Sequence, residues 1–399
     1  MSCVSPPSPV TRLSQVIIDA DKAWPTPWAG AHIPAWALVP WLYRKRFTVT
    51  NATLGLLTDY QIKLRVYSDI GVDSGNTIYI NGLVKDTFAD FRITNNAGAP
   101  LPYWIEQISL PWADIWVRLD SIPVGDTDFW IYFGNAAAAS LSSGPGTFII
   151  FNPGDSIVGW TDVTVAASGN VDWAVNAGRI RATSSAINAA AFLYCDTITG
   201  IDSYKIRAHI MAQDGLTAAN YRQGFVNKVA QDDVLSYSAW RDTENYWRIS
   251  DEGGLFTNSG AEATFDARVD HEYISLRTPA QLQLFVDSVL KVTHLRGAWS
   301  PQYIGLFATM AATPHWVDFW DIFVANYADP EPAVSGSGSI EGYYEAYGIT
   351  NLKELAAGMA KGDLAMSDGT VLAIISPGSI GTNLITHEFG NVLTWGYPP

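Results

Sequence analysis

Hydrophobic and polar residues alternate along much of this chain, a pattern typical of β-strands with one buried face. In the first part of the chain, strands are predicted at 47–50, 60–67, 115–119 and 129–133. Farther on, they are predicted at 204–210, 272–277, 282–286, 303–307 and 316–324. Clusters of Asn, Asp, Gly and Pro separate these segments, as turn residues do. The pattern therefore predicts a mainly β protein with two consecutive antiparallel β-sandwiches.

Changes in composition mark the expected domain boundaries. Residues 1–40 are rich in Pro and Trp and are interpreted as an N-terminal attachment segment, and the two sandwiches are expected at 41–146 and 147–330. The run 331–339 ends in alternating Ser and Gly at 335–339, which is typical of a flexible linker. Residues 340–399 are predicted to form a small α+β attachment or oligomerisation domain.

Short motifs predict two hairpins and a helix. Asp287-Ser288 separates two alternating segments and predicts a tight turn between 282–286 and 289–293. Asn351-Leu-Lys-Glu354 matches a capping box that opens a short helix. Asp368-Gly369 predicts the turn of a second hairpin near the C-terminus.

Charge and composition exclude several classes of partner. The chain has 399 residues, and its 39 acidic against 24 basic residues give a formal net charge of −15. Such a surface repels phosphates, so nucleic acid is not expected as a partner. No apolar run is long enough to span a bilayer, and the N-terminus lacks a basic segment followed by an apolar one, so neither membrane insertion nor a secretory signal is expected. Cys3 and Cys195 predict no disulfide framework.

Residues 41–135 resemble the DUF2341 family of β-sandwich modules. The motifs that carry this resemblance are Trp41-Leu-Tyr-Arg44, Asp90-Phe-Arg92, Leu101-Pro-Tyr-Trp-Ile-Glu106, Ile115-Trp-Val-Arg118 and Ile131-Tyr-Phe-Gly-Asn135. The family has no established biochemical activity, so the resemblance implies a fold and a setting in surface or secreted proteins.

Residues 147–328 resemble a concanavalin or laminin-G-like jelly roll, a lectin-like fold that often follows such a module. The similarity lies in Gly178-Arg-Ile180, His271-Glu-Tyr-Ile-Ser-Leu-Arg277, Phe285-Val-Asp287 and Val317-Asp-Phe-Trp-Asp-Ile-Phe-Val324. The jelly-roll glycosidases of this fold carry a Glu-x-Asp-x-x-Glu strand, and no such string occurs here.

The C-terminal segment resembles parts of tail-fibre and receptor-binding proteins of tailed viruses. The resemblance rests on Gly362-Asp-Leu364, Asp368-Gly-Thr370, Pro377-Gly-Ser-Ile-Gly381 and Val392-Leu-Thr-Trp395. It implies that a strand near 16–22 belongs beside 342–352, with both sandwiches inserted between the two halves of an attachment domain. A virion protein made in the host cytoplasm needs no export signal, which agrees with the N-terminus.

The sequence carries no complete motif of a known catalytic site. His387-Glu388 begins a zinc-protease-like pattern, but Asn391 stands where the second His is required. The six His residues show no ligand spacing, and there is no phosphate loop or nucleophile elbow. We therefore expect no enzymatic activity and no catalytic residue.

Calcium is a further candidate, because lectin-like sandwiches often hold an ion near their first and last strands. The resemblance points to Asp155, Asp318 and Asp321 as ligands, with carbonyls and waters completing the roughly six to eight oxygens that this ion takes. However, Asn152-Pro153 stands where the family pattern has an Asp pair. The alternative is that Asp318 and Asp321 are solvating groups or internal hydrogen-bond acceptors.

Aromatic residues offer the most plausible binding surface, since sugars stack their C–H faces on Trp and Tyr rings while carboxylates and amides bind their hydroxyl groups. The candidates are Tyr237, Trp240, Arg241 and Trp247. The alternative is that half of these rings are core, because alternate residues of a strand point inward.

These observations favour a non-enzymatic virion structural or adhesion protein, a tail fibre, spike or capsid decoration that displays lectin-like domains toward host-surface glycans. Its expected partners are other virion proteins and further copies of itself, with a trimer expected for a fibre. One alternative is a cellular surface or extracellular protein that binds or processes carbohydrate. Another is a pure scaffold whose sandwiches contact only neighbouring subunits.

Overall fold

The computed structural model describes the two sandwich regions and four short strands near the C-terminus. The described residues are 41–164, 171–184, 189–197, 201, 203–213, 222–228, 237–241, 246–250, 255–262, 264–295, 303–310, 315–342, 364–367, 370–373, 383–385 and 394–396. The chain divides into two compact units, Ile33–Glu341 and a unit of both chain ends. The N-terminal attachment segment, the helix expected from Asn351 and the proposed neighbourhood of 16–22 and 342–352 lie outside the described residues.

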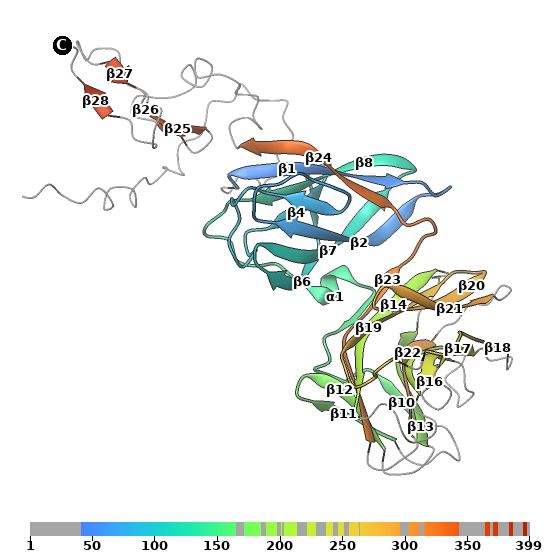
Figure 1. The fold of residues 1–399 in the computed structure, drawn as a ribbon. Coiled ribbons are helices and arrows are strands. Elements are labelled where there is room, and N and C mark those ends of the chain that lie inside the picture. Colours follow the sequence, from blue (N-terminus) through green and yellow to red (C-terminus); the bar gives the residue numbers. More distant parts are fainter. Residues whose placement is uncertain are drawn as a thin grey trace, which may run out of the picture. The chain divides into compact units, whose positions relative to one another are not determined.

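The described fold is almost entirely β, and the first sandwich packs a four-stranded sheet on a five-stranded one (Figure 1). The four-stranded sheet has the order β3 (Thr77–Tyr79), β2 (Leu57–Tyr67), β7 (Trp112–Ile122), β6 (Tyr103–Ser109). The five-stranded sheet has the order β24 (Ala333–Gly342), β1 (Tyr43–Asn51), β8 (Gly125–Phe133), β4 (Arg92–Asn95), β5 (Pro100–Leu101). Their facing apolar side chains, such as Phe47, Leu64 and Ile131, form one buried core.

Strand β24 corrects two predictions about domain organisation, the linker at 331–339 and the confinement of the first sandwich to 41–146. The Ser/Gly-rich run predicted at 331–339 to be a linker instead pairs along β1 as an edge strand (Figure 1). Its apolar residues Val334 and Ile340 pack against the first core, and Glu341 forms an ion pair with Arg44 at 2.7 Å. The first sandwich is therefore discontinuous in sequence, and the second sandwich is inserted between β8 and β24.

The second sandwich packs a seven-stranded sheet on an eight-stranded one. The seven-stranded sheet has the order β10 (Thr161–Thr164), β13 (Ala189–Thr197), β22 (Tyr303–Met310), β15 (Arg222–Lys228), β16 (Tyr237–Arg241), β17 (Tyr246–Ser250), β18 (Phe256–Asn258). The eight-stranded sheet has the order β11 (Val171–Asn176), β12 (Arg179–Ser184), β23 (His315–Asn326), β14 (Tyr204–Ala212), β19 (His271–Arg277), β20 (Gln281–Val286), β21 (Val289–Leu295), with β9 (Ile150–Asn152) also paired to β23. Phe225, Tyr273 and Phe319 lie in the core between them.

Both predicted hairpins are confirmed. Asp287 and Ser288 have φ of 49° and 65° between β20 and β21, which is the left-handed pair of a type I′ turn. Near the C-terminus, β25 (Leu364–Ser367) pairs with β26 (Thr370–Ala373), and β27 (Asn383–Ile385) pairs with β28 (Thr394–Gly396). Among the described residues, no helix is long and apolar enough to cross a membrane.

Aromatic rings join the two sandwiches where the chain passes from one to the other. The short helix α1 (Gly144–Thr147), labelled in Figure 1, is followed along the chain by β9. Phe148, next to it, stacks on Phe323 of β23 with ring centroids 4.1 Å apart, and Trp116 of β7 packs edge-on against both. The backbone N–H of Asn326 also donates to Gln61 Oε1 at 2.9 Å. The two sandwiches thus share a small apolar cluster of their own.

Candidate functional site

One face of the eight-stranded sheet carries an ordered set of aromatic and charged side chains. Along β23, Trp316, Asp318 and Trp320 alternate with Val317 and Phe319, which point into the core. The first set therefore lies on the outer face of the sheet. Adjacent strands add Arg179 and Arg181 from β12 and His209 from β14. We call these six residues the Trp-Asp-Trp face.

Asp318 fixes Arg181 at the centre of this face. Its carboxylate accepts two hydrogen bonds from Arg181, at 2.6 Å from Nε and 2.8 Å from Nη2, and is 1% exposed. The hydrogen bonds raise the pKa of Arg181, so this guanidinium stays charged. It also lies over the Trp316 ring, 4.0 Å from the centroid. A charged, planar group is thus held against an aromatic ring in one orientation.

Trp320 is stacked between groups from the strands on either side. The Arg179 guanidinium from β12 lies 4.0 Å from its ring centroid, and the His209 ring from β14 stacks on it at 5.5 Å and an interplanar angle of 20°. His209 in turn places Nδ1 2.8 Å from Asp270. The result is a row of planar groups across three strands, whose members are only half-buried.

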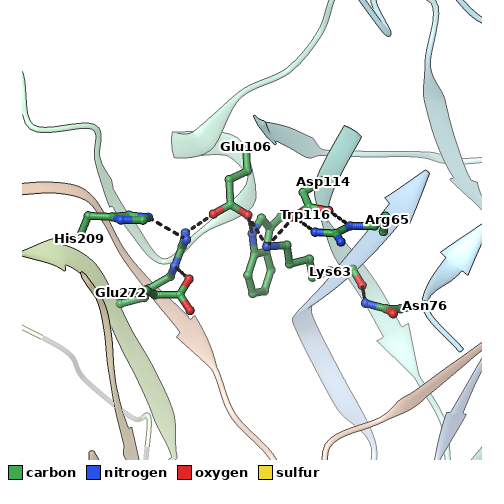
Figure 2. A network of polar contacts seen from close by, with 9 residues as sticks. Lys63, Arg65, Asn76, Glu106, Asp114, Trp116, His209 and Glu272 are labelled. Atoms are coloured by element: carbon green, nitrogen blue, oxygen red, sulfur yellow. Dashed lines mark hydrogen bonds and ion pairs between the residues drawn. The ribbon is translucent and has the colours of Figure 1, made fainter. Parts of the chain in front are cut away.

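A second charged cluster lies beside this face, where the first sandwich covers the sheet. Figure 2 shows Glu106 of β6 directed toward the second sandwich, between His209 and Glu272 on one side and Lys63 and Trp116 on the other. The centre of the cluster is Arg207 of β14, which forms ion pairs with both Glu106 and Glu272. Only 5% of the Arg207 side chain and 9% of the Glu106 side chain is exposed.

Glu106, His209 and Glu272 form the one group among the described residues with the proximity of metal ligands. Arg207 contacts all three, donating to His209 Nε2 at 3.2 Å and pairing with both carboxylates. A guanidinium is a permanent cation, so it already supplies the positive charge that a metal would bring. The cluster is therefore built as an ion-pair network, and we assign no metal to it.

The cations of the network keep Glu106 and Asp114 ionised. Burial alone would raise the pKa of Glu106, but Arg207 and Lys63 outweigh it and hold that pKa below its ordinary value. Burial likewise opposes ionisation of Asp114, while hydrogen bonds from Arg65 and the charge of Lys63 lower its pKa. Both carboxylates therefore stabilise the fold while they are charged.

Acidification should weaken this junction. A carboxylate whose pKa is lower in the folded state stabilises the fold above its unfolded pKa, about 4.3 for Glu, and this contribution disappears as the pH falls through the folded value. We expect the melting temperature to decrease once the pH is below about 4.5. In Glu106→Gln the melting temperature should decrease less steeply with falling pH than in the wild type. Differential scanning calorimetry across pH 3–7 measures both slopes. Glu331→Gln, which changes a half-exposed carboxylate, is the control and should keep the wild-type slope.

The structure places the predicted glycan-binding residues on the seven-stranded sheet. Trp247 is fully buried in the core and donates from Nε1 to Glu262 at 2.7 Å, so its prediction as a sugar contact is wrong. Tyr237, Trp240 and Arg241 lie on β16, where Trp240 is registered opposite Trp247 and Arg241 opposite Tyr246. Their side chains lie outside the described part of the structure, so their role stays a prediction.

The predicted calcium ligands do not converge. Among the described residues, Asp155, Asp318 and Asp321 form no group with the spacing of metal ligands. Asp155 is exposed on the loop after β9, and Asp318 is occupied by Arg181. Asp321 occupies a bulge of β23 with φ of 48°, and burial raises the pKa of its carboxyl, which disfavours the charge a cation needs. These three residues do not fit a shared calcium site, and Asp318 is the internal hydrogen-bond acceptor of the alternative interpretation.

A known protein family matches only part of the chain. The domain of unknown function DUF2341 matches residues 87–163, which supports the predicted resemblance over residues 87–135 and extends beyond it into β10. No curated protein matches the sequence. The resemblance of the C-terminus to tail-fibre proteins stays a prediction.

Several solved structures are similar to half of the chain or less. A structure from work on endo-acting O-glycanases of the human gut microbiota that initiate mucin breakdown is 12% identical, with a TM-score of 0.33, covering 45% of this chain and all of that one. The carbohydrate-binding module CBM66 from Bacillus subtilis is 13% identical, with a TM-score of 0.32, covering 42% and 96%. A sialidase is 10% identical, with a TM-score of 0.34, covering 50% of this chain but only 20% of its own length. Similarities this partial leave ligand and activity to be derived from the residues of the site.

Proposed function

We propose that this protein is a non-enzymatic adhesion protein that binds glycans on the Trp-Asp-Trp face. The observation that carries the proposal is the alternation of Trp316, Asp318 and Trp320 on the outer face of β23, each contacted by an arginine of β12. Sugars are recognised by aromatic surfaces together with planar groups that donate hydrogen bonds in fixed directions. This face combines both in half-exposed positions.

The charged cluster at the junction supports a binding role over a catalytic one. A glycosidase needs one carboxylic acid with a raised pKa beside an ionised carboxylate. Glu106 and Glu272 both pair with Arg207, and the pKa of Glu106 lies below its ordinary value. Glu106 is therefore not prepared to donate a proton.

The setting we propose is a virion surface, as a tail fibre, spike or capsid decoration held by the chain ends to other virion proteins and to further copies of this chain. Weak binding at one site becomes effective when several copies are tethered together. The same face would serve a cellular surface carbohydrate-binding protein, and a pure scaffold would bind no glycan. Immunogold labelling distinguishes the first two. Label on intact virus particles supports the virion setting, and label on the surface of cells supports the cellular one.

Replacing the face's tryptophans should reduce glycan binding. We expect Trp316→Ala and Trp320→Ala each to lower binding on a glycan array by about fivefold or more, since an aromatic contact contributes about 0.5–1.5 kcal/mol beyond its buried area and the array is multivalent. The matched control is Trp130→Ala on the first sandwich, where Arg44 lies over the ring at the same 4.0 Å. Equal losses in all three variants, or no binding by the wild type to any host-derived glycan, would contradict the proposed function.

A further inference from the structure

The Trp-Asp-Trp face has more positive than negative charge at its centre. Two guanidiniums, those of Arg179 and Arg181, share the single carboxylate of Asp318. Two closer arginine–tryptophan stacks of the first sandwich are balanced: Arg44 over Trp130 pairs with Glu341, and Arg65 over Trp112 pairs with Asp114. A third, Arg92 over Trp41, has no carboxylate, but its guanidinium donates to backbone carbonyl groups instead. One of the two arginines on the face therefore lacks a carboxylate of its own.

That arginine is Arg179. Both Asp318 oxygens accept hydrogen bonds from Arg181, and Arg179 Nη1 stays 3.8 Å from Oδ2, beyond hydrogen-bonding distance. Within the described part of the chain its guanidinium donates no hydrogen bond, and 36% of its side chain is exposed. A guanidinium has five N–H donors in a plane that matches a carboxylate or sulfate. Arg179 thus presents unused donors to solvent.

The backbone around Arg179 is fixed. It follows a tight turn between β11 and β12, in which Ala177 and Gly178 have φ of 50° and 74°. Gly154 packs so closely on this turn that an added Cβ would overlap the Gly178 carbonyl oxygen and approach Trp320 Cβ to 3.1 Å. With the Trp320 ring beneath the guanidinium, the donors are oriented before a ligand arrives, which lowers the entropic cost of binding.

We propose that the glycan bound on this face is acidic, and that its carboxylate or sulfate accepts hydrogen bonds from Arg179. The inference rests on the proposed function and adds the ligand's charge to it. A protein with a net charge of −15 repels acidic glycans at long range. Selectivity for the anion must therefore come from local pairing with an oriented guanidinium, a contact that salt weakens while it also screens the long-range repulsion.

The test uses the full chain and pairs of probes that differ only in the acidic group. The probes are sialyllactose and lactose, oligogalacturonate and its methyl ester, and sulfated and desulfated carrageenan oligosaccharides. We expect the wild type to bind the acidic member of at least one pair about tenfold more tightly, the scale of a charged hydrogen bond. Arg179→Gln should remove this preference, and Arg179→Lys should restore part of it. Arg44→Gln, which alters the balanced stack on the first sandwich, should leave it unchanged.

The outcomes separate this inference from the proposed function. Equal binding of charged and neutral probes, with binding still lost in Trp320→Ala, would overturn the acidic ligand and leave glycan binding standing. A preference that survives Arg179→Gln would overturn the role of Arg179. Binding to no probe and to no glycan on the array would overturn both. Thermal midpoints of each variant within about 2 °C of the wild type would show that binding, and not folding, has changed.

Discussion

Replacing Arg207 with Met is expected to lower the free energy of unfolding by about 3–5 kcal/mol, the usual cost of removing one partner of a buried ion pair. Arg207 pairs with Glu106 and Glu272 across the junction of the two sandwiches, and only 5% of its side chain is exposed. Without it, Glu106 stays buried with Lys63 and the Trp116 Nε1–H as its remaining partners. The desolvation of that carboxylate is then poorly offset.

Urea denaturation followed by tryptophan fluorescence measures this loss. Arg118→Met is the control, because Arg118 pairs with Asp59 at 3.7 Å in an exposed position and should cost less than about 1 kcal/mol. The double variant Arg207→Met/Glu106→Leu should recover part of the stability, since it removes the buried charge together with its partner. A cost for Arg207→Met no greater than that for Arg118→Met would mean that the junction network does not hold the sandwiches together.

The strands could be predicted from sequence because their signals are local. The alternation at 60–67 falls within β2, and Asp287-Ser288 adopts the left-handed turn that a two-residue hairpin requires. Strand β24 had no comparable signal, because Ser and Gly lower strand propensity and its partner β1 lies far away in sequence. Only the outlying Val334 and Ile340, which reach the first core, marked it as more than a linker.

The binding face was harder to predict, because alternation separates two faces without saying which one is covered. Both faces of β23 carry aromatic rings, Trp316 and Trp320 on one and Phe319 on the other, so the rings alone did not assign the core to the second face. The same ambiguity made Trp247 a sugar candidate, although it is core. The available signal was Asp318 between two tryptophans at alternate positions, with Arg179 and Arg181 spaced alike on another strand.

Arg207 shows a different limit of sequence reasoning. Its place between Ile206 and Ala208 predicts an outward, solvated side chain, and it does point away from the core of its own sandwich. The first sandwich then covers it, so that it is buried against Glu106. Burial by a second domain depends on the packing of two folds, and no pattern within one strand carries that information.

Gly305→Ala is the other substitution with a large expected effect, a loss of about 3 kcal/mol in the free energy of unfolding. Gly305 lies on β22, paired with Tyr194 of β13 on one side and Val226 of β15 on the other. An added Cβ would overlap the carbonyl group of Leu193 and crowd the Tyr194 Cα. These are backbone atoms of a paired strand, so relief requires the strands to separate and their hydrogen bonds to lengthen.

The matched control is Gly260→Ala in the loop after β18, where an added Cβ meets no atom within 4 Å. Alanine has the smaller conformational entropy in the unfolded chain, so this control should be neutral or stabilising by up to about 1 kcal/mol. Thermal and urea unfolding at pH 7 give the free energy of unfolding of both variants. The difference between them separates the effect of crowding from that of backbone entropy. Similar stabilities for Gly305→Ala and Gly260→Ala would mean that β13 and β22 can move apart at little cost. Tight packing of β13 against β22 would then not be required for the core of the second sandwich, which carries the Trp-Asp-Trp face on its other sheet.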